Sequence, residues 1–230
     1  MVDTGNDLAT LQQQASIRRS IEEDVTRLFA AEDEGLRYAL MAAKQGGLPA
    51  IQISPMQGKF LQLMAAACHA RKILEIGSLA GYSGIWLARA LPADGRLITL
   101  EVNPHHADIV RRSLAKAGVA DRAEVRMGKA LDLLPQLESE APFDLVFIDA
   151  DKPPYPQYLE WALHLARPGS IIIADNCIRR GEAFHPSEDE ALKGLYEYNR
   201  RIASDPRLVS LVLPMDEDYT DGFAIAVVRA

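Results

Sequence analysis

Residues 143–151 read FDLVFIDAD, a short and almost wholly apolar run that ends in two aspartates two positions apart. A strand that is apolar on both faces is typical of a parallel sheet covered by helices on both sides. Similar runs occur before and after it and alternate with helical segments. The predicted strands are Lys72–Ile76, Arg96–Glu101, Ala123–Met127, Phe143–Ile148 and Ser170–Ala174. We therefore predict an α/β fold with a doubly wound, mostly parallel sheet.

Helical segments separate these strands, and further elements follow them. The helices between strands are predicted at Ser83–Leu91, Pro104–Ala117, Ala130–Leu137 and Pro156–Ala166. A helix at Glu188–Ser204 then precedes two more strands, Leu208–Leu213 and Gly222–Val228. The turn-rich segment 214–221 between them favours an antiparallel hairpin at the sheet edge. The sheet thus has seven predicted strands.

The first third of the chain is helical in pattern and contains no predicted strand. Ser54, Pro55 and Gln57 match an N-cap, a first-turn proline and a capping-box glutamine, which indicates a helix that leads into the first strand. The 230 residues, 48% of them apolar, suit one domain with a sizeable core. We predict a single domain, 1–230, with a helical extension at 1–53 and a core at 54–230.

Charge and cysteine content narrow the class of protein. The net charge of −7 argues against a broad basic surface, so nucleic-acid and membrane partners are disfavoured and a small-molecule ligand is favoured. Cys68 and Cys177 are the only cysteines and form no Cys-x-x-Cys pair, which suits a reducing compartment. The chain starts without a basic-then-apolar leader and has no run of ~20 apolar residues, so we expect a cytoplasmic protein.

Acidic residues follow two of the predicted strands. Asp149 and Asp151 end one of them, and Asp175 with Asn176 ends the next. Neighbouring carboxylates repel each other, and a divalent cation is the simplest way to offset that repulsion. Helix capping is the alternative for each aspartate alone, because a helix N-terminus favours negative charge. The two acidic strand ends together favour a site for a hard metal ion.

The turn after the first strand and the end of the second strand indicate a nucleoside ligand. Residues 75–84 read EIGSLAGYSG, whose glycines allow close approach of a ligand to the backbone. The spacing departs from Gly-x-Gly-x-x-Gly, which disfavours a nicotinamide cofactor. Glu101 ends the second strand, where an acid commonly accepts ribose hydroxyls. These features favour an adenosine ligand without a diphosphate, and S-adenosylmethionine is the leading candidate.

Several motifs resemble those of a known family in the same order along the chain. They are residues 72–77 (KILEIG), 81–83 (GYS) and 147–152 (FIDADK), the pair Tyr155 and Tyr158, and the pair Asp175 and Asn176. From about Ser54 to the C-terminus the chain resembles the cation-dependent O-methyltransferases, which include caffeoyl-CoA O-methyltransferases and are related to catechol O-methyltransferases. The resemblance implies a Rossmann-like class I S-adenosylmethionine-dependent methyltransferase fold. It also implies a homodimer in which the N-terminal region helps to cap the active site.

The resemblance also implies a role for individual residues. The implied contacts to S-adenosylmethionine are Ile53, Glu75, Gly77, Ser78, Ser83, Glu101, Ala130, Asp149 and Asp151. The implied metal ligands are Asp149, Asp175 and Asn176, whose hard oxygens suit Mg²⁺, with Mn²⁺ or Ca²⁺ as alternatives. Asp149 and Lys152 are the implied catalytic residues, with Lys152 as the base that takes the phenolic proton.

The expected reaction is methylation of one hydroxyl of a small vicinal dihydroxy aromatic, of the catechol or hydroxycinnamoyl type. Tyr155 and Arg180 are candidate substrate contacts, although core packing and ordinary surface charge explain them equally well. Two alternatives stay open, methylation of 5-hydroxyuridine in transfer RNA and a non-catalytic S-adenosylmethionine-binding protein, whereas a third, a nicotinamide-dependent oxidoreductase, fails on the glycine spacing. The acidity counts against the first and the complete metal set against the second.

Overall fold

The computed structural model describes residues 4–215 and 220–230, and for residues 4–9, 11 and 12 it describes the backbone alone. Seven strands form one sheet in the order β3-β2-β1-β4-β5-β7-β6. The strands are β1 (Lys72–Ile76), β2 (Arg96–Glu101), β3 (Ala123–Met127), β4 (Phe143–Ile148), β5 (Ala166–Ala174), β6 (Leu208–Pro214) and β7 (Gly222–Val228). All seven predicted strands are confirmed.

Strand direction in the sheet follows the predicted pattern. Strands β1 to β5 pair in parallel, whereas β7 is antiparallel to both β5 and β6. The predicted C-terminal antiparallel pair is therefore confirmed, although its connection runs through residues 216–219, which lie outside the described residues. The strand order reverses between β1 and β4. In doubly wound sheets the crevice for ligands lies beyond the carboxyl ends of the strands at such a reversal.

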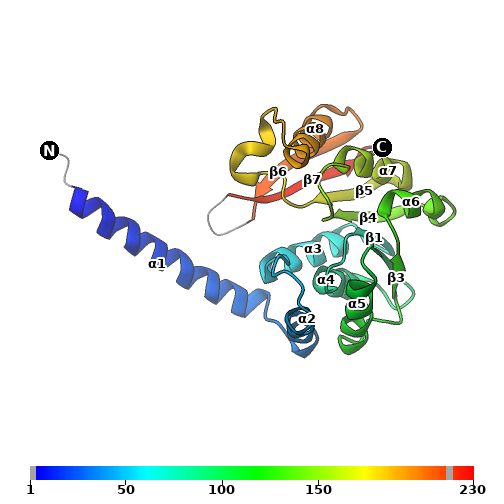
Figure 1. Cartoon of the computed structure of the whole chain (residues 1–230), viewed down its shortest axis with the longest axis horizontal. Coiled ribbons are helices and arrows are strands. Elements are labelled where there is room, and N and C mark those ends of the chain that lie inside the picture. The colour runs from blue at the N-terminus through cyan, green and yellow to red at the C-terminus, as the bar shows by residue number, and fades with distance from the viewer. Residues whose placement is uncertain (1–3, 216–219) are drawn as a thin grey trace.

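Helices cover both faces of the sheet, as Figure 1 shows. Helices α2 (Glu34–Gln45), α3 (Pro55–Ala67), α4 (Tyr82–Ala90) and α5 (Pro104–Lys116) lie on one face. Helices α6 (Ala130–Leu133), α7 (Tyr155–Leu165) and α8 (Glu190–Ser204) lie on the other, together with the 3₁₀ segments η1 (Leu134–Glu140) and η2 (Arg179–Phe184). The result is a three-layer sandwich.

Alternate side chains of each central strand enter different layers of the core. Leu74 and Ile76 of β1 belong to the apolar cluster that contains α7 and α8, whereas Ile73 belongs to the cluster that contains α3 and α4. Val146 and Phe147 of β4 divide in the same way. Burial of both strand faces is the reason that these runs are continuously apolar rather than alternating.

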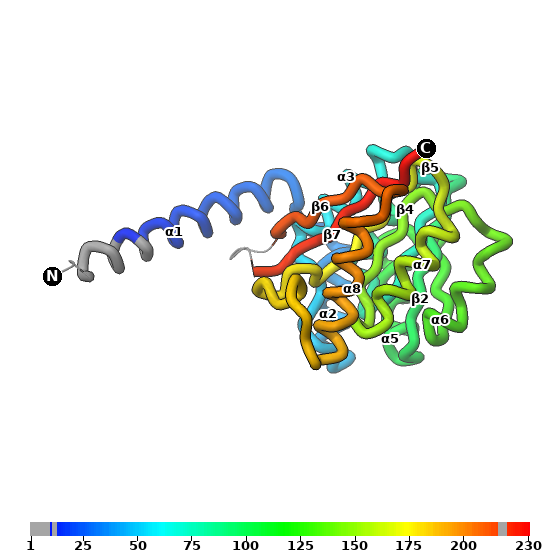
Figure 2. Tube along the Cα trace, turned by 90° about the horizontal axis from the view of Figure 1, so that it is seen from above, coloured from blue at the N-terminus to red at the C-terminus, as the bar shows by residue number. Residues whose placement is uncertain are grey.

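The N-terminal region forms three helices. Ser54 caps α3 reciprocally with Gln57, as the capping box predicts: the Gln57 amide donates to Ser54 Oγ at 3.2 Å, and the Ser54 amide donates to Gln57 Oε1 at 2.7 Å. Helix α1 (Thr4–Phe29) contacts α3 but projects away from the sandwich, as both Figure 1 and Figure 2 show. No helix in the described part of the chain combines the length and the apolar composition needed to cross a membrane.

Two elements differ in extent from their predictions. Strand β5 begins at Ala166 rather than Ser170, because Ala166 pairs with Phe143 across a register shift despite the proline and glycine that follow it. The helix predicted at 130–137 is a single α-turn followed by the 3₁₀ segment η1, which has Pro135 in its first turn. A proline removes an amide donor, which interrupts the α-helical hydrogen-bond pattern.

Candidate active site

A cavity of about 980 Å³ lies at the carboxyl ends of β1, β2 and β4. Its walls are the loops that follow these strands and β3, at residues 76–80, 100–102, 128–132 and 149–152. Residues 51–53, which precede α3, line it as well. A volume near the upper end of the range for small-molecule sites has room for a cofactor and a substrate together.

The turn after β1 depends on glycine. Gly77 has φ of 95°, and a Cβ atom built on it would lie 2.1 Å from the carbonyl oxygen of Asp149. Any side chain at this position would therefore push apart the loops that follow β1 and β4. Gly81, with φ of 83°, then begins α4. Gly77 therefore allows the two loops to meet at the cavity.

Glu101, at the end of β2, holds this glycine turn in place. Its Oε2 accepts the amide N–H of Leu79 at 3.0 Å, and its Oε1 accepts that of Asn103 at 2.9 Å. The side chain lines the cavity, and His106 Nδ1 lies 3.7 Å from Oε1. Oε2 also accepts the amide of Ser78 at 3.4 Å, which leaves Oε1, with one such bond, as the oxygen with a further acceptor site. The carboxylate is thus placed to take hydroxyl donors of a ligand in the cavity.

Glu75 lies beneath the turn and is fully buried. Its oxygens accept hydrogen bonds from Ser83 Oγ and Thr99 Oγ1, each at 2.5 Å. Burial raises the pKa of this carboxyl from 4.5 to about 7, because loss of solvent disfavours the charged form more than the two hydroxyl donors favour it. Glu75 therefore supports the turn from inside the protein.

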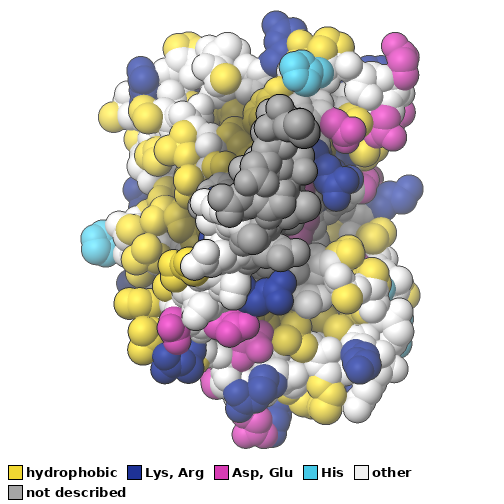
Figure 3. Space-filling model, turned by 90° about the vertical axis from the view of Figure 1, so that its left-hand side faces the viewer, with side chains coloured by type: hydrophobic (Ala, Val, Ile, Leu, Met, Phe, Trp, Pro, Cys, Tyr) yellow, Lys and Arg dark blue, Asp and Glu magenta, His cyan; other side chains and the backbone are white. Residues whose placement is uncertain are grey.

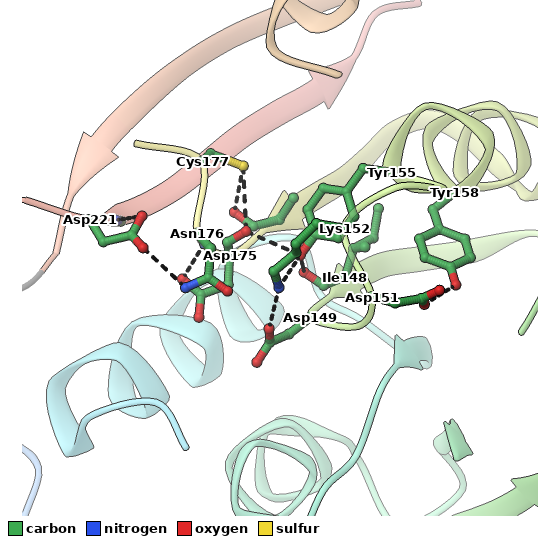
Figure 4. A network of polar contacts seen from close by, with 12 residues as sticks. Ile148, Asp149, Asp151, Lys152, Tyr155, Tyr158, Asp175, Asn176, Cys177 and Asp221 are labelled. Atoms are coloured by element: carbon green, nitrogen blue, oxygen red, sulfur yellow. Dashed lines mark hydrogen bonds and ion pairs between the residues drawn. The ribbon is translucent and has the colours of Figure 1, made fainter. Parts of the chain in front are cut away.

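The acidic residues after β4 and β5 gather at the other end of the cavity, as Figure 4 shows. Asp149 and Asn176 line the cavity, and Asp175 is 7% exposed beside them. Burial and then the nearby Asp149 carboxylate raise the pKa of Asp175. The Asp175 carboxylate accepts the amide N–H of Asn176 at 2.7 Å, which offsets only part of this effect. The charge of Lys152 also lowers the pKa of Asp175, but the net shift stays upward.

This donor set fits a hard divalent cation. Two carboxylates and an amide oxygen are typical ligands of Mg²⁺, and a cation there would offset the repulsion that raises the pKa of Asp175. Within residues 4–215 and 220–230, no cluster of three or more His, Cys, Asp or Glu side chains is arranged to hold a metal. Asp149 and Asp175 supply only two such groups, and Asn176 would be the third ligand.

Lys152 lies between the acidic residues and a buried tyrosine. Its Nζ donates to Asp149 Oδ1 at 3.0 Å and to the Tyr155 hydroxyl at 2.8 Å, and its side chain is 14% exposed. The Tyr155 hydroxyl in turn lies 3.1 Å from the carbonyl oxygen of Asp175 and can donate to it. Burial raises the pKa of Tyr155 well above its usual value, so this phenol stays neutral. Lys152 is thus held at the cavity wall.

Tyr158 fixes the second aspartate of the loop after β4. Its hydroxyl donates to Asp151 Oδ1 at 2.6 Å, and both residues line the cavity. Burial and this hydrogen bond raise the pKa of the phenol. Asp151 is therefore held toward Tyr158, apart from the Asp149 and Asp175 pair, as Figure 4 shows.

Comparison with known proteins identifies the family. Residues 30–226 match the model of the O-methyltransferase family. A catechol O-methyltransferase of Niastella koreensis is 46% identical over 218 residues, which cover 93% of this chain and 98% of the relative. The chain belongs to the O-methyltransferase family. The predicted family, fold and enzyme class are thereby confirmed.

Solved structures agree with this assignment. An O-methyltransferase from Bacillus cereus, in complex with SAH, is 45% identical with a TM-score of 0.87 and covers 91% of this chain and 97% of its own. TomG from Streptomyces achromogenes, in complex with SAM, is 40% identical with a TM-score of 0.87 and covers 92% and 96%. The described fold is thus that of the family's solved members.

The structure brings most of the predicted site residues of this O-methyltransferase to one cavity. The predicted residues that line it are Ile53, Gly77, Ser78, Ser83, Glu101, Ala130, Asp149, Asp151, Lys152 and Asn176. Two other predicted residues of the site do not line it: Glu75 is buried beneath the turn, and Asp175 lies beside Asp149. Glu75 is linked to the cavity through Ser83, which lines it and donates to Glu75 Oε1 at 2.5 Å.

The two candidate substrate contacts lie elsewhere than predicted. Tyr155 is fully buried and does not line the cavity, because its ring packs against Tyr198 in the core while its hydroxyl faces Lys152. Arg180 also lies outside the cavity lining, whereas its neighbour Arg179 is part of it. Both arginines have positive φ, 47° at Arg179 and 55° at Arg180. A loop of this conformation has no regular repeat from which side-chain direction follows.

Other residues of the cavity were not predicted to be site residues. Gln52, Leu79, His106, Lys129 and Tyr158 all line it. His106 looks like part of a solvated first helical turn, and Leu79 has a positive φ of 50° that an ordinary leucine does not suggest. The sequence clue to Leu79, His106 and Lys129 is their position after β1, β2 and β3, whereas Tyr158 belongs to the motif pair with Tyr155.

Burial of Glu75 makes the stability of this O-methyltransferase depend on pH. An acid whose pKa is higher in the folded state binds its proton more tightly when folded, so stability falls as pH rises from 4.5 to about 7. A difference of this size corresponds to about 3 kcal/mol of unfolding free energy. We expect Glu75→Gln to lose this fall in urea unfolding measured between pH 5 and 8. Glu188→Gln, at an exposed site, is the control, and equal slopes in both variants would contradict the prediction.

Proposed function

We propose that this protein transfers the methyl group of S-adenosylmethionine to one hydroxyl of a small vicinal dihydroxy aromatic, with a divalent cation in the site. Catechol and hydroxycinnamoyl compounds are the substrate class, and Mg²⁺ is the leading cation, with Mn²⁺ or Ca²⁺ as alternatives. The observation that carries the proposal is that the two ends of one cavity are lined by chemically different groups. The glycine turn and Glu101 form one, and Asp149, Asn176 and Lys152 form the other.

The first end of the cavity suits the cofactor. Glu101 offers carboxylate oxygens beside a backbone that glycine leaves uncovered, and Ala130 and Asp151 extend the same wall. Two similar structures support this choice, since one is in complex with SAH and the other with SAM. Names of relatives, such as the catechol O-methyltransferase of Niastella koreensis, support the substrate class.

The acidic end suits the methyl acceptor. Asp149, Asp175 and Asn176 would hold the cation, which when bound orients two adjacent substrate oxygens and lowers the proton affinity of a phenol. Lys152 lies 3.0 Å from Asp149. The neutral amine of Lys152 is placed to accept the phenolic proton. Tyr155 holds the Lys152 amine in that position from below.

Methyl transfer is then an in-line displacement. The C–O bond to the substrate forms as the C–S bond of the sulfonium breaks, so the cofactor leaves as a neutral thioether and the phenolic proton stays on Lys152. No nucleophile of the protein takes part. The rate enhancement comes from holding the oxygen and the methyl carbon in line and from removing the proton. Positioning of this kind lowers the activation barrier by several kcal/mol.

A screen with labelled S-adenosylmethionine tests the proposal. Catechols, hydroxycinnamoyl esters and hydroxylated transfer RNA are offered as acceptors, first after treatment with a chelator and then with Mg²⁺ restored. We expect label on the small dihydroxy aromatics, with loss of the label in chelator and its return with Mg²⁺. Label on transfer RNA alone would favour the 5-hydroxyuridine alternative. Binding of the cofactor without transfer to any acceptor would favour a non-catalytic protein.

We also propose that the protein is a homodimer in which α1 packs on the second copy. Ile17, Ile21 and Leu28 fall on one face of this helix and are 52–66% exposed. A helix that projects alone into water is marginally stable, so an apolar face of this length favours a partner. Figure 3 views the molecule from the side on which α1 projects and shows a band of hydrophobic side chains there.

The oligomeric state tests the role of α1. We expect the double variant Ile21→Glu and Leu28→Glu to halve the molar mass measured by light scattering, because two charges on the apolar face oppose its burial. Arg19→Glu, an exposed position on the opposite face of the same helix, is expected to leave the dimer intact. A monomeric wild-type protein, or an equal mass for both variants, would refute this arrangement.

A further inference from the structure

Asp221, at the start of β7, contacts the acidic end of the cavity from a distant part of the sequence. Its Oδ2 accepts the side-chain amide of Asn176 at 3.1 Å, as Figure 4 shows. Its Oδ1 accepts the backbone amides of Ile178 and Arg179, each at 3.2 Å, and that of Gly222 at 2.9 Å. One carboxylate thus joins the loop after β5 to the first residues of β7.

The loop that Asp221 holds has an unusual backbone. Asn176, Arg179 and Arg180 have φ values of 60°, 47° and 55°, in the left-handed region that costs most side chains free energy. Such conformations persist where the surrounding structure determines them. Here β7 and the residues before it provide the hydrogen bonds: besides the Asp221 contacts, the Cys177 amide donates to the Gly222 carbonyl at 3.0 Å. The position of Asn176 therefore depends on this part of the chain.

The chemistry of the Asn176 side chain makes its orientation decisive. An asparagine amide has an oxygen that accepts and a nitrogen that donates, and only the oxygen can bind a cation. A carboxylate accepts hydrogen bonds only, so Asp221 selects the orientation in which Nδ2 faces it. Oδ1 is then the atom left for a ligand. The opposite orientation would place two oxygens together and present an N–H group to the cation.

We propose that Asp221 is a positioning residue for the cation site: it holds the Asn176 amide in the one orientation that offers an oxygen to the cation. The inference rests on the proposed function, since it assigns a role toward the cation proposed there. It adds Asp221, which contacts Asn176 and lies outside the cavity lining. Residues that orient metal ligands in this way commonly change metal affinity by 10- to 100-fold.

A double-mutant cycle tests this role with Mn²⁺ as the probe, without cofactor or substrate. In Asp221→Asn, the carbonyl oxygen is expected to stay with the three backbone amides, so the new NH₂ group faces the NH₂ group of Asn176. The Asn176 amide then rotates, and we expect Mn²⁺ affinity to fall at least about tenfold. Free Mn²⁺ is measured by electron paramagnetic resonance, which reports binding independently of activity.

The second half of the cycle is measured in the Asn176→Asp background, which reverses the hydrogen-bonding group needed at residue 221. Asn176→Asp alone places two carboxylates against each other, and addition of Asp221→Asn gives the new carboxylate a donor again. We therefore expect Asp221→Asn to weaken Mn²⁺ binding when residue 176 is asparagine, and to leave it equal or stronger when that residue is aspartate. The sign of this difference separates orientation of one side chain from general damage to the loop.

Two controls complete the experiment. Asp189→Asn removes a carboxylate that accepts two backbone amides at the start of α8, remote from the cavity lining, and is expected to leave Mn²⁺ affinity unchanged. S-adenosylmethionine binding is measured for each variant and is expected to match that of the wild type. Equal effects of Asp221→Asn in both backgrounds, or no effect in either, would overturn the inference while the proposed function stands. A wild-type protein without Mn²⁺ affinity would overturn both.

Discussion

Asp149→Asn is expected to lower kcat/KM at least about 10³-fold, which corresponds to about 4 kcal/mol of transition-state stabilisation. The substitution keeps the size of the side chain but removes one of the two carboxylates at the acidic end of the cavity. It also removes the negative charge that pairs with Lys152 Nζ at 3.0 Å. Both effects act at the place where the substrate oxygens are expected to lie. Initial rates of methyl transfer at saturating and limiting substrate measure the loss.

The same substitution is expected to preserve or raise the stability of the cation-free protein. The Asp149 carboxylate contributes to the raised pKa of Asp175, so its removal relieves repulsion between two partly buried acids. Urea unfolding in chelator measures this effect. A loss of activity without a loss of stability indicates a functional group and not a structural one. Such opposed effects are common where a site stores repulsion that a ligand relieves.

Two controls accompany Asp149→Asn. Asp108→Asn removes an exposed carboxylate on α5 that pairs with Arg111, and its activity is expected to equal that of the wild type. Chelator treatment of the wild-type protein should reproduce most of the loss seen for Asp149→Asn. Full activity of either the variant or the wild type in chelator would contradict a cation-dependent mechanism.

Lys152→Ala is expected to lower kcat by about 10²- to 10⁴-fold, the range for loss of a general base. The affinity for S-adenosylmethionine is expected to stay within about twofold, because Lys152 contacts Asp149 and Tyr155 rather than the glycine turn. The loss should be largest at low pH. As pH rises toward the pKa of a free phenol, near 10, the substrate ionises without a base and the difference shrinks.

Two further variants separate the base from the structure around it. Lys152→Arg keeps a positive charge beside Asp149 but cannot release a proton at these pH values, so its turnover should be as low as that of Lys152→Ala. Tyr155→Phe keeps the buried ring and removes the acceptor of Lys152 at 2.8 Å, so a smaller loss of kcat is expected. Turnover that is unchanged across pH in Lys152→Ala would remove this residue from the mechanism.

Elements whose pattern is local were predictable from the sequence. Strands β1 and β4 follow the predicted ranges because each is a short, mostly apolar run between turns. The capping box at Ser54 and Gln57 forms as predicted because its partners are three residues apart. The extra length of β5 was not predictable, since Arg167, Pro168 and Gly169 favour a turn. They join the strand because Ala166 pairs with Phe143 of β4.

The sequence by itself determined the order of the elements, the family and the carboxyl edge of the sheet at which the site residues lie. This follows because strand and helix periodicity is local, and because the ends of parallel strands meet at one edge.

The tertiary structure alone decided which of two neighbouring residues in the sequence faces the cavity. Tyr158 lines it while Tyr155 is buried against Lys152, and Arg179 lines it in place of Arg180. Asp221 reaches Asn176 across 45 residues of chain. Such contacts depend on how distant strands pack and on left-handed backbone angles in the loops, and neither leaves a periodic signal in the sequence.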